Sequence, residues 1–285
     1  MGITATDAAY FGIQSVPAAA VFAALYLLFL AGFILQSFRE RSRVYYSLTF
    51  FCAVRLTSFI LRAIIAGTRG NNVGLLIGAE VLFAIGFFSL IYSTYNLVLD
   101  RELLSEHTSS SIISRVIRRR HLFRLVLLAA IVMGSVGISD INTSNDSNTI
   151  STGKSLHTTS TIIFFVLSVL VVYQALIVAK NELRYGAYKL GKGAFGRFQP
   201  YILLLISLLL LVREGFAMVT VNDFQKANNE RLWYPLIAMP EILAVALFSI
   251  PGLVPGKREF PAKPETPRPA VRISRSMEVF HEGKN

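Results

Sequence analysis

Residues 16–35 read VPAAAVFAALYLLFLAGFIL, and no acidic or basic side chain occurs between positions 8 and 38. An α-helix needs about 20 consecutive apolar residues to cross the hydrocarbon core of a bilayer. This stretch is long enough and is apolar on every side. It therefore predicts a membrane-spanning helix rather than the amphipathic helix of a soluble domain.

The composition extends that interpretation to the whole chain of 285 residues. Hydrophobic side chains make up 53% of it and charged ones only 16%, and the mean hydropathy is +0.54. A soluble domain is about one quarter charged. The apolar content excludes a disordered or collagen-like chain, and the single cysteine, Cys52, excludes a disulfide-rich scaffold.

Six further stretches resemble the first in length and composition, so we expect an all-α membrane protein, a bundle of seven transmembrane helices. The expected spans are residues 14–36, 44–67, 73–98, 122–139, 159–179, 199–221 and 232–254. Together they form a membrane domain over residues 1–254. Residues 255–285 are rich in Pro, Lys, Arg, Ser and Glu, which predicts a disordered basic tail.

The distribution of basic residues predicts the orientation. Three alternate loops and the tail hold 20 of the 28 Lys and Arg residues, whereas the other loops hold four. Because positively charged loops stay in the cytoplasm, we expect the N-terminus outside and the C-terminus in the cytoplasm, in the plasma membrane or another secretory-pathway membrane. The net charge of +11 then reflects topology and contact with anionic inner-leaflet lipid, and no nucleic-acid partner is expected.

Two kinds of modification site fit this orientation. Residues 140–157 are expected to form an outer loop, and they contain two glycosylation sequons, at Asn142 and Asn145. In the tail, Ser274 and Ser276 lie next to or near arginines, and phosphorylation there would weaken attachment to anionic lipid.

Ionisable residues within the spans are the main candidates for a functional site. There are six of interest: Arg55, Arg62, Glu80, Arg213, Glu214 and Glu241. Each would cost about 2.5–3.5 kcal/mol at a helix centre if it faced lipid. They must therefore contact one another, water or a ligand. Arg62 with Glu80, on consecutive helices, is the best-matched expected pair, and Arg55 or Arg213 with Glu241 is the second.

Two interpretations of these six residues remain open. In the first, they line a charged cavity in the outer half of the bundle, between the second, third, sixth and seventh spans. Such a cavity could bind a small amphipathic ligand or pass a proton. In the second, the three basic and three acidic side chains form a salt-bridge network that only holds the helices together.

Catalytic motifs are missing from the sequence. It contains no HExxH, GxSxG or nucleotide-binding loop, and its four histidines, at 107, 121, 157 and 281, fall outside the expected spans. An intramembrane metal site would need clustered ligands at helical spacing. We therefore expect no enzymatic activity, no metal and no cofactor.

Short motifs resemble an uncharacterised fungal seven-transmembrane domain family. They are Arg55 within FFCAVRLTSFILRA, the Ile-Gly-Phe-Phe of residues 85–88, the Leu-Val-Arg of residues 211–213, and Pro240-Glu241 followed by Gly252-Leu253. The chain is more distantly similar to the fungal lipid-translocating-exporter family. In that family an Arg of the sixth span is followed three residues later by Glu, whereas here Arg213 and Glu214 are adjacent. The resemblance implies an integral membrane protein of fungal type.

The sequence thus favours a non-enzymatic membrane protein that binds or translocates a small amphipathic or lipid-like molecule. Membrane lipids are its expected partners. A seven-helix receptor-like sensor and a structural membrane scaffold are the alternatives.

Overall fold

The computed structural model describes residues 15–40, 42–68, 73–104, 119–185, 198–227 and 229–255. The predicted tail beyond residue 255 lies outside these residues, and so do Ser274 and Ser276.

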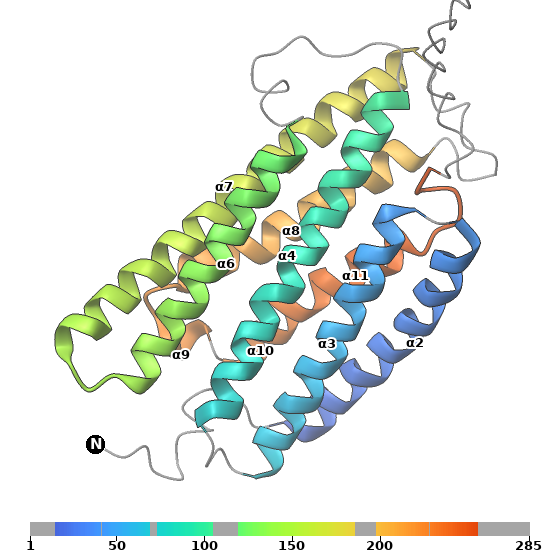
Figure 1. Ribbon diagram of the computed structural model, residues 1–285. Helices are drawn as coiled ribbons and strands as arrows, with labels where there is room; N and C mark the ends of the chain where they lie inside the picture. Colours follow the sequence, from blue (N-terminus) through green and yellow to red (C-terminus); the bar gives the residue numbers. More distant parts are fainter. Residues whose placement is uncertain are drawn as a thin grey trace, which may run out of the picture.

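Every regular element in the described part of the chain is a helix (Figure 1). The helices are α2 (Val16–Glu40), α3 (Arg43–Gly67), α4 (Val73–Leu104), α6 (Arg120–Thr143), α7 (Ser147–Tyr185), α8 (Gln199–Thr220), α9 (Phe224–Ala227), α10 (Glu230–Trp233), the π-helix η3 (Tyr234–Ala238) and α11 (Met239–Phe248). Seven segments are long and apolar enough to cross a membrane, and α10, η3 and α11 together form the seventh, Glu230–Phe248. The expected all-α class with seven helices of spanning length is therefore confirmed.

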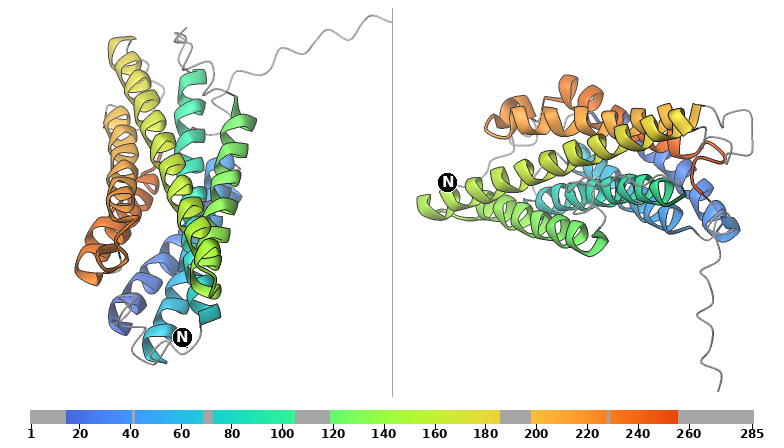
Figure 2. Two further views of the ribbon diagram at one scale, coloured as in Figure 1. Left: turned by 90° about the vertical axis from the view of Figure 1, so that its left-hand side faces the viewer. Right: turned by 90° about the horizontal axis from the view of Figure 1, so that it is seen from above.

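Helix α4 lies in the middle of the bundle. It contacts α3 on one side and α6, α7 and α8 on the other. Helix α2 packs mainly on α3, and α11 packs on α8. Figure 2 shows α2, α3 and α4 running together, with α6 and α7 as a long neighbouring pair. Residues that face α4 from several helices can thus meet around a common centre.

The outward faces of the helices are apolar. Leu28 and Leu35 of α2 are each 71% exposed, and Val219 of α8 is 83% exposed. In water, such side chains would form unfavourable apolar patches. Hydrocarbon chains of a bilayer would cover them without cost, which agrees with the composition of the spans.

The seventh segment contains two prolines that explain its irregular turn. Proline has no backbone N–H, and its ring crowds the carbonyl four residues earlier. The π-helical turn η3 contains Pro235 and ends just before Pro240, and the N–H of Met239 bonds the carbonyl of Tyr234. This wider turn relieves the crowding and keeps α10, η3 and α11 continuous. The π-helical turn also determines the direction in which Glu241, the residue after Pro240, faces.

Helix α7 begins earlier than the sequence predicts. The loop expected over residues 140–157 is wrong, because only residues 144–146 separate α6 from α7. The polar residues 147–158 mark where the apolar stretch ends and not where the helix ends. Asp146 caps the helix by accepting hydrogen bonds from the Oγ1 and backbone N of Thr149, at 3.0 and 3.2 Å. These bonds lower the pKa of the Asp146 carboxyl.

Helices α6 and α7 approach closely because small residues face one another. A Cβ atom on Gly137 would lie 2.6 Å from the carbonyl oxygen of Gly153, and one on Gly153 would lie 2.9 Å from that of Gly137. One turn earlier in α6, Gly134 leaves room for Ser160, whose Oγ donates to the carbonyl of Ala130 at 2.6 Å. Small residues allow close helix packing where apolar burial cannot drive association. The pair extends past the ends of its neighbours (Figure 2).

Substituting Gly137→Leu should therefore destabilise the protein by about 1–3 kcal/mol, because overpacking forces the two helix backbones apart. The matched control is Gly32→Leu in α2, where an added Cβ meets nothing within 4 Å. The measurement is the free energy of unfolding in detergent micelles. Equal losses in the two variants would contradict this account of the α6–α7 contact.

Candidate functional site

Buried charges meet at Glu241 of α11. Arg55 of α3 donates from Nη2 to Glu241 Oε1, and Arg213 of α8 donates from Nε to the same oxygen at 3.2 Å. The side chains of Arg55 and Glu241 are both 0% exposed. Arg213 also forms an ion pair with its neighbour Glu214 through Nη1. Two arginines and two glutamates thus neutralise one another, as charges removed from water require.

Each of three arginines in this region also lies over an aromatic ring. The guanidinium carbon is 3.9–4.3 Å from the ring centroid in the pairs Arg55 over Phe83, Arg62 over Trp233 and Arg213 over Phe87. A ring face carries negative charge density and attracts a cation, more strongly where water is excluded. The rings of α4 and α10 therefore help to stabilise arginines from α3 and α8 inside an apolar bundle.

Gly86 of α4 makes the position of Arg55 possible. A Cβ atom at this position would lie 3.2–3.3 Å from the Cζ, Nε and Nη1 atoms of the Arg55 guanidinium. That separation is tighter than ordinary van der Waals contact, so a larger side chain would displace the guanidinium.

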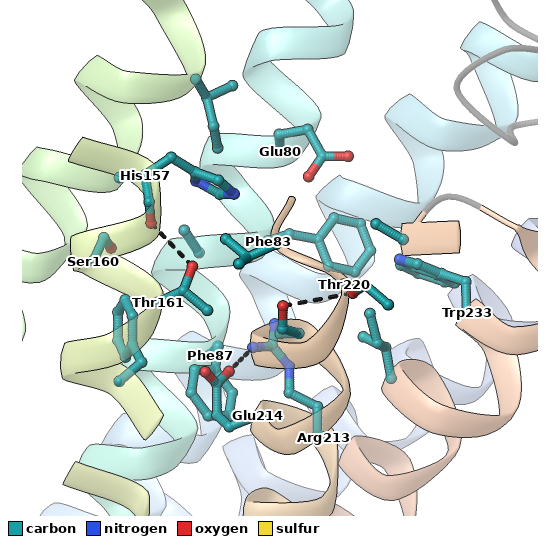
Figure 3. Close-up of a pocket in the computed structure, with 18 of the residues that line it drawn as sticks. Glu80, Phe83, Phe87, His157, Ser160, Thr161, Arg213, Glu214, Thr220 and Trp233 are labelled. Atoms are coloured by element: carbon teal, nitrogen blue, oxygen red, sulfur yellow. Dashed lines mark hydrogen bonds and ion pairs between the residues drawn. The ribbon is translucent and has the colours of Figure 1, made fainter. Parts of the chain in front are cut away.

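A partly open cavity of about 200 Å³ adjoins these charges, with walls from α4, α6, α7, α8 and the α10–η3 segment. Figure 3 shows Glu80 and His157 in the upper part of the view, with Arg213 and Glu214 below them. Aromatic rings and aliphatic side chains form most of the wall. The ionisable and amide side chains that line it are Glu80, Asn142, His157, Arg213 and Glu214, together with the hydroxyls of Ser160, Thr161 and Thr220. Apolar walls with a few converging polar groups are typical of small-molecule sites.

The structure confirms one expected pairing and corrects the other. Glu241 binds both Arg55 and Arg213. The predicted pair of Arg62 with Glu80 is wrong, because neither forms an ion pair with any residue in the described ranges. Sequence spacing gives the depth of a side chain in its helix but not the rotation of that helix against its neighbours. Arg62 faces Trp233, whereas Glu80 faces the cavity.

The walls of the cavity also differ from the prediction. Helix α3, the second span, contributes none of the lining residues, whereas α6 and α7 contribute several, including Asn142 and His157. The placement of all four histidines outside the spans is wrong for His157 and His121, because α7 begins at Ser147 and α6 at Arg120. The spacing of Gly153, His157, Ser160 and Phe164 on one helical face was an available signal. A hydropathy window detects only the apolar stretch, so it does not include Gly153 and His157.

The two sequons occupy different environments. Asn142 lies in the last turn of α6, lines the cavity, and donates from Nδ2 to the carbonyl of Ile138 at 2.8 Å. Asn145 is exposed in the turn between α6 and α7. Only Asn145 therefore offers the accessible amide that a glycan requires.

A second buried polar cluster lies at the opposite end of α4. Arg101 donates from Nε to Glu182 of α7 at 3.1 Å and from Nη2 to Gln199 of α8 at 2.5 Å. The amide of Gln199 donates to the carbonyl of Gly252 at 2.9 Å. These contacts join α4, α7 and α8 to the segment after α11. Arg101 and Glu182 fall in loops between the expected spans, so their pairing inside the bundle was not predicted.

Metal-binding chemistry finds no support in the part of the chain that the structure describes. Within those residues no three His, Cys, Asp or Glu side chains are grouped as a metal site would require. The residues that line the cavity carry charge, hydrogen-bonding groups and apolar surface.

Replacing Glu241 with Ala should destabilise the protein by about 3–5 kcal/mol, because the buried Arg55 and Arg213 lose a shared acceptor. The control is Lys226→Ala, which removes an ion pair with Asp223 whose side chains are 72% and 42% exposed. Its cost should be below about 1 kcal/mol. Unfolding by denaturant in mixed micelles measures both values, and similar losses would contradict the importance of the buried cluster.

Comparison with known proteins places the chain in a family. Neither the curated proteins nor the solved structures contain a match. Residues 16–193 match the family described as a domain of unknown function (DUF7702), and this range covers more than half of the chain. It includes α2 to α7, and thereby Arg55, Glu80 and His157, and ends before Arg213 and Glu241. The chain belongs to the DUF7702 family.

Proposed function

We propose that this chain is a non-enzymatic, multi-pass membrane protein that binds or translocates a small amphipathic molecule in the cavity between α4, α6, α7, α8 and the α10–η3 segment. The observation that supports the proposal is the composition of the cavity wall. Phe83, Phe87 and Trp233 offer apolar contact, and Glu80 and His157 offer polar contact in the same space. A molecule with a polar head and an apolar body matches both.

The volume of the cavity limits what it can hold. A water molecule occupies about 30 Å³ in the liquid, so about 200 Å³ admits several waters or a compact headgroup. A whole two-chain lipid is much larger. The ligand is therefore either a small amphiphile or the polar end of a lipid whose chains extend between the helices.

The buried cluster at Glu241 supports a structural role for part of the predicted site. Arg55 and Glu241 are fully buried and paired, and neither lines the cavity. We assign helix packing to these two residues and ligand contact to the polar residues of the cavity wall. In this proposal the cluster at Glu241 stabilises the bundle, and the cavity binds the ligand.

The orientation inferred from the basic loops would place the cavity in the outer half of the membrane. The cavity is lined by the ends of α6 and α7 that join at residues 144–146, and that turn falls on the predicted outer side. In this arrangement the basic tail would contact anionic lipid of the inner leaflet. A plasma membrane or another secretory-pathway membrane is the proposed location.

The proposal can be tested with Trp233, because it is the single tryptophan of the chain and lines the cavity. The protein is placed in zwitterionic nanodiscs. Undecyl chains brominated close to the headgroup are then added, carrying an ammonium, trimethylammonium, hydroxyl or carboxylate headgroup. Bromine quenches tryptophan on contact, so at least one amphiphile should quench Trp233 saturably.

A cavity-filling variant separates specific binding from contact with bulk lipid. Ala217 lines the cavity, so Ala217→Phe should weaken binding at least tenfold. Ala31→Phe, at an exposed position of α2, should leave binding unchanged. Quenching that never saturates for any headgroup, or that is the same in Ala217→Phe, would overturn the proposal. Net movement of the ligand across a sealed vesicle would distinguish translocation from sensing.

A further inference from the structure

We infer that the cavity selects a cationic headgroup bearing N–H groups, a protonated amine, and that Glu80 is the residue that binds it. This inference rests on the proposed binding function and names its ligand class. The argument compares the charged and polar groups of the cavity that already form ion pairs or hydrogen bonds within the protein with those that do not.

Arg213, the arginine that lines the cavity, is already paired with acidic residues of the protein. Arg213 donates from Nε to Glu241 at 3.2 Å and from Nη1 to Glu214. Its guanidinium carbon also lies 3.9 Å from the centroid of the Phe87 ring. Glu214 and Glu241 are neutralised by the same contacts. Arg213 is thus a poor partner for an anionic ligand, because two carboxylates already surround it.

Glu80 is different from the other acids of the region. It is half-buried in the cavity wall, and its carboxylate makes no ion pair or hydrogen bond with any residue that the structure describes. Arg62, its predicted partner, stacks on Trp233 and does not line the cavity. Arg62, Arg213 and Arg55 act on this carboxylate only from beyond ion-pair distance. The carboxylate is consequently the acidic group of the cavity wall that no side chain in the described ranges contacts.

Two hydroxyl groups of the cavity wall favour the same ligand. The hydroxyl of Thr161 donates to the carbonyl of His157 at 3.0 Å, and that of Ser160 donates to the carbonyl of Ala130 at 2.6 Å. Each hydroxyl has one hydrogen, and in both residues that hydrogen is already donated within the protein. Both hydroxyls can therefore only accept a hydrogen bond from a ligand. A ligand that donates hydrogen bonds therefore fits these two hydroxyls better than one that accepts them.

The aromatic wall next to Glu80 suits the carbon atoms beside an ammonium nitrogen. Phe83 follows Glu80 by three residues on α4, so both face the same side of the helix. The Phe83 and Trp233 rings meet edge to face, with centroids 5.1 Å apart. An ammonium group would then contact the carboxylate, while its methylene groups contact these rings (Figure 3).

The substitution Glu80→Gln tests the inference with the brominated undecyl series and the fluorescence of Trp233. In the wild type, the ammonium compound should bind at least tenfold more tightly than the hydroxyl and carboxylate compounds. It should also bind more tightly than the trimethylammonium compound, which lacks N–H donors. Glu80→Gln should lower the affinity for the ammonium compound at least tenfold and leave the affinity for the hydroxyl compound unchanged.

The outcomes are distinguishable. Tightest binding of the carboxylate compound, or an ammonium preference that persists in Glu80→Gln, would overturn the inference and leave the binding function intact. Absence of saturable quenching by every compound would instead overturn the proposed function itself. Unfolding temperatures establish that Glu80→Gln is folded. Glu80→Asp, which keeps the charge, should retain the ammonium preference and so separates charge from shape.

Discussion

The bundle depends on one carboxylate oxygen, Glu241 Oε1, which accepts from Arg55 of α3 and from Arg213 of α8. Charges in an apolar environment are tolerated only when they are paired and hydrogen-bonded. Three separate helices must therefore keep a fixed rotation and depth so that these side chains meet. The π turn before Pro240 and the absence of a side chain at Gly86 are local features that permit the meeting.

The same cluster shapes the cavity. The rings of Phe83 and Phe87 are partners of Arg55 and Arg213, and the same rings line the cavity. A neutral cluster thus holds an aromatic wall in place, and the wall faces a space lined by Glu80, whose carboxylate forms no contact ion pair among the described residues. In the function proposed above, structural and binding roles are divided between neighbouring charges, so the six ionisable residues found in the sequence do not act as one group.

The fold was largely predictable from the sequence because span length and hydropathy are local properties. Pairing at Glu241 was predictable too, since a buried acid needs a cation and few were available. The partner of Arg62 was not, because the rotation of each helix depends on packing that one sequence does not reveal. The polar first turns of α7 were not predicted, because hydropathy indicates which residues can contact lipid and not which residues form a helix. For the same reason, neither the position of His157 nor the contribution of α6 and α7 to the cavity wall was predicted.

The central claim is that Arg55 and Glu241 act together and not as independent buried residues. A double-mutant cycle with Arg55→Met, Glu241→Met and the double variant measures this coupling from free energies of unfolding in micelles. We expect the double variant to lose less stability than the two single losses combined, by about 1–3 kcal/mol, because removing both charges leaves neither unpaired. Additive losses, with a coupling energy near zero, would contradict the account.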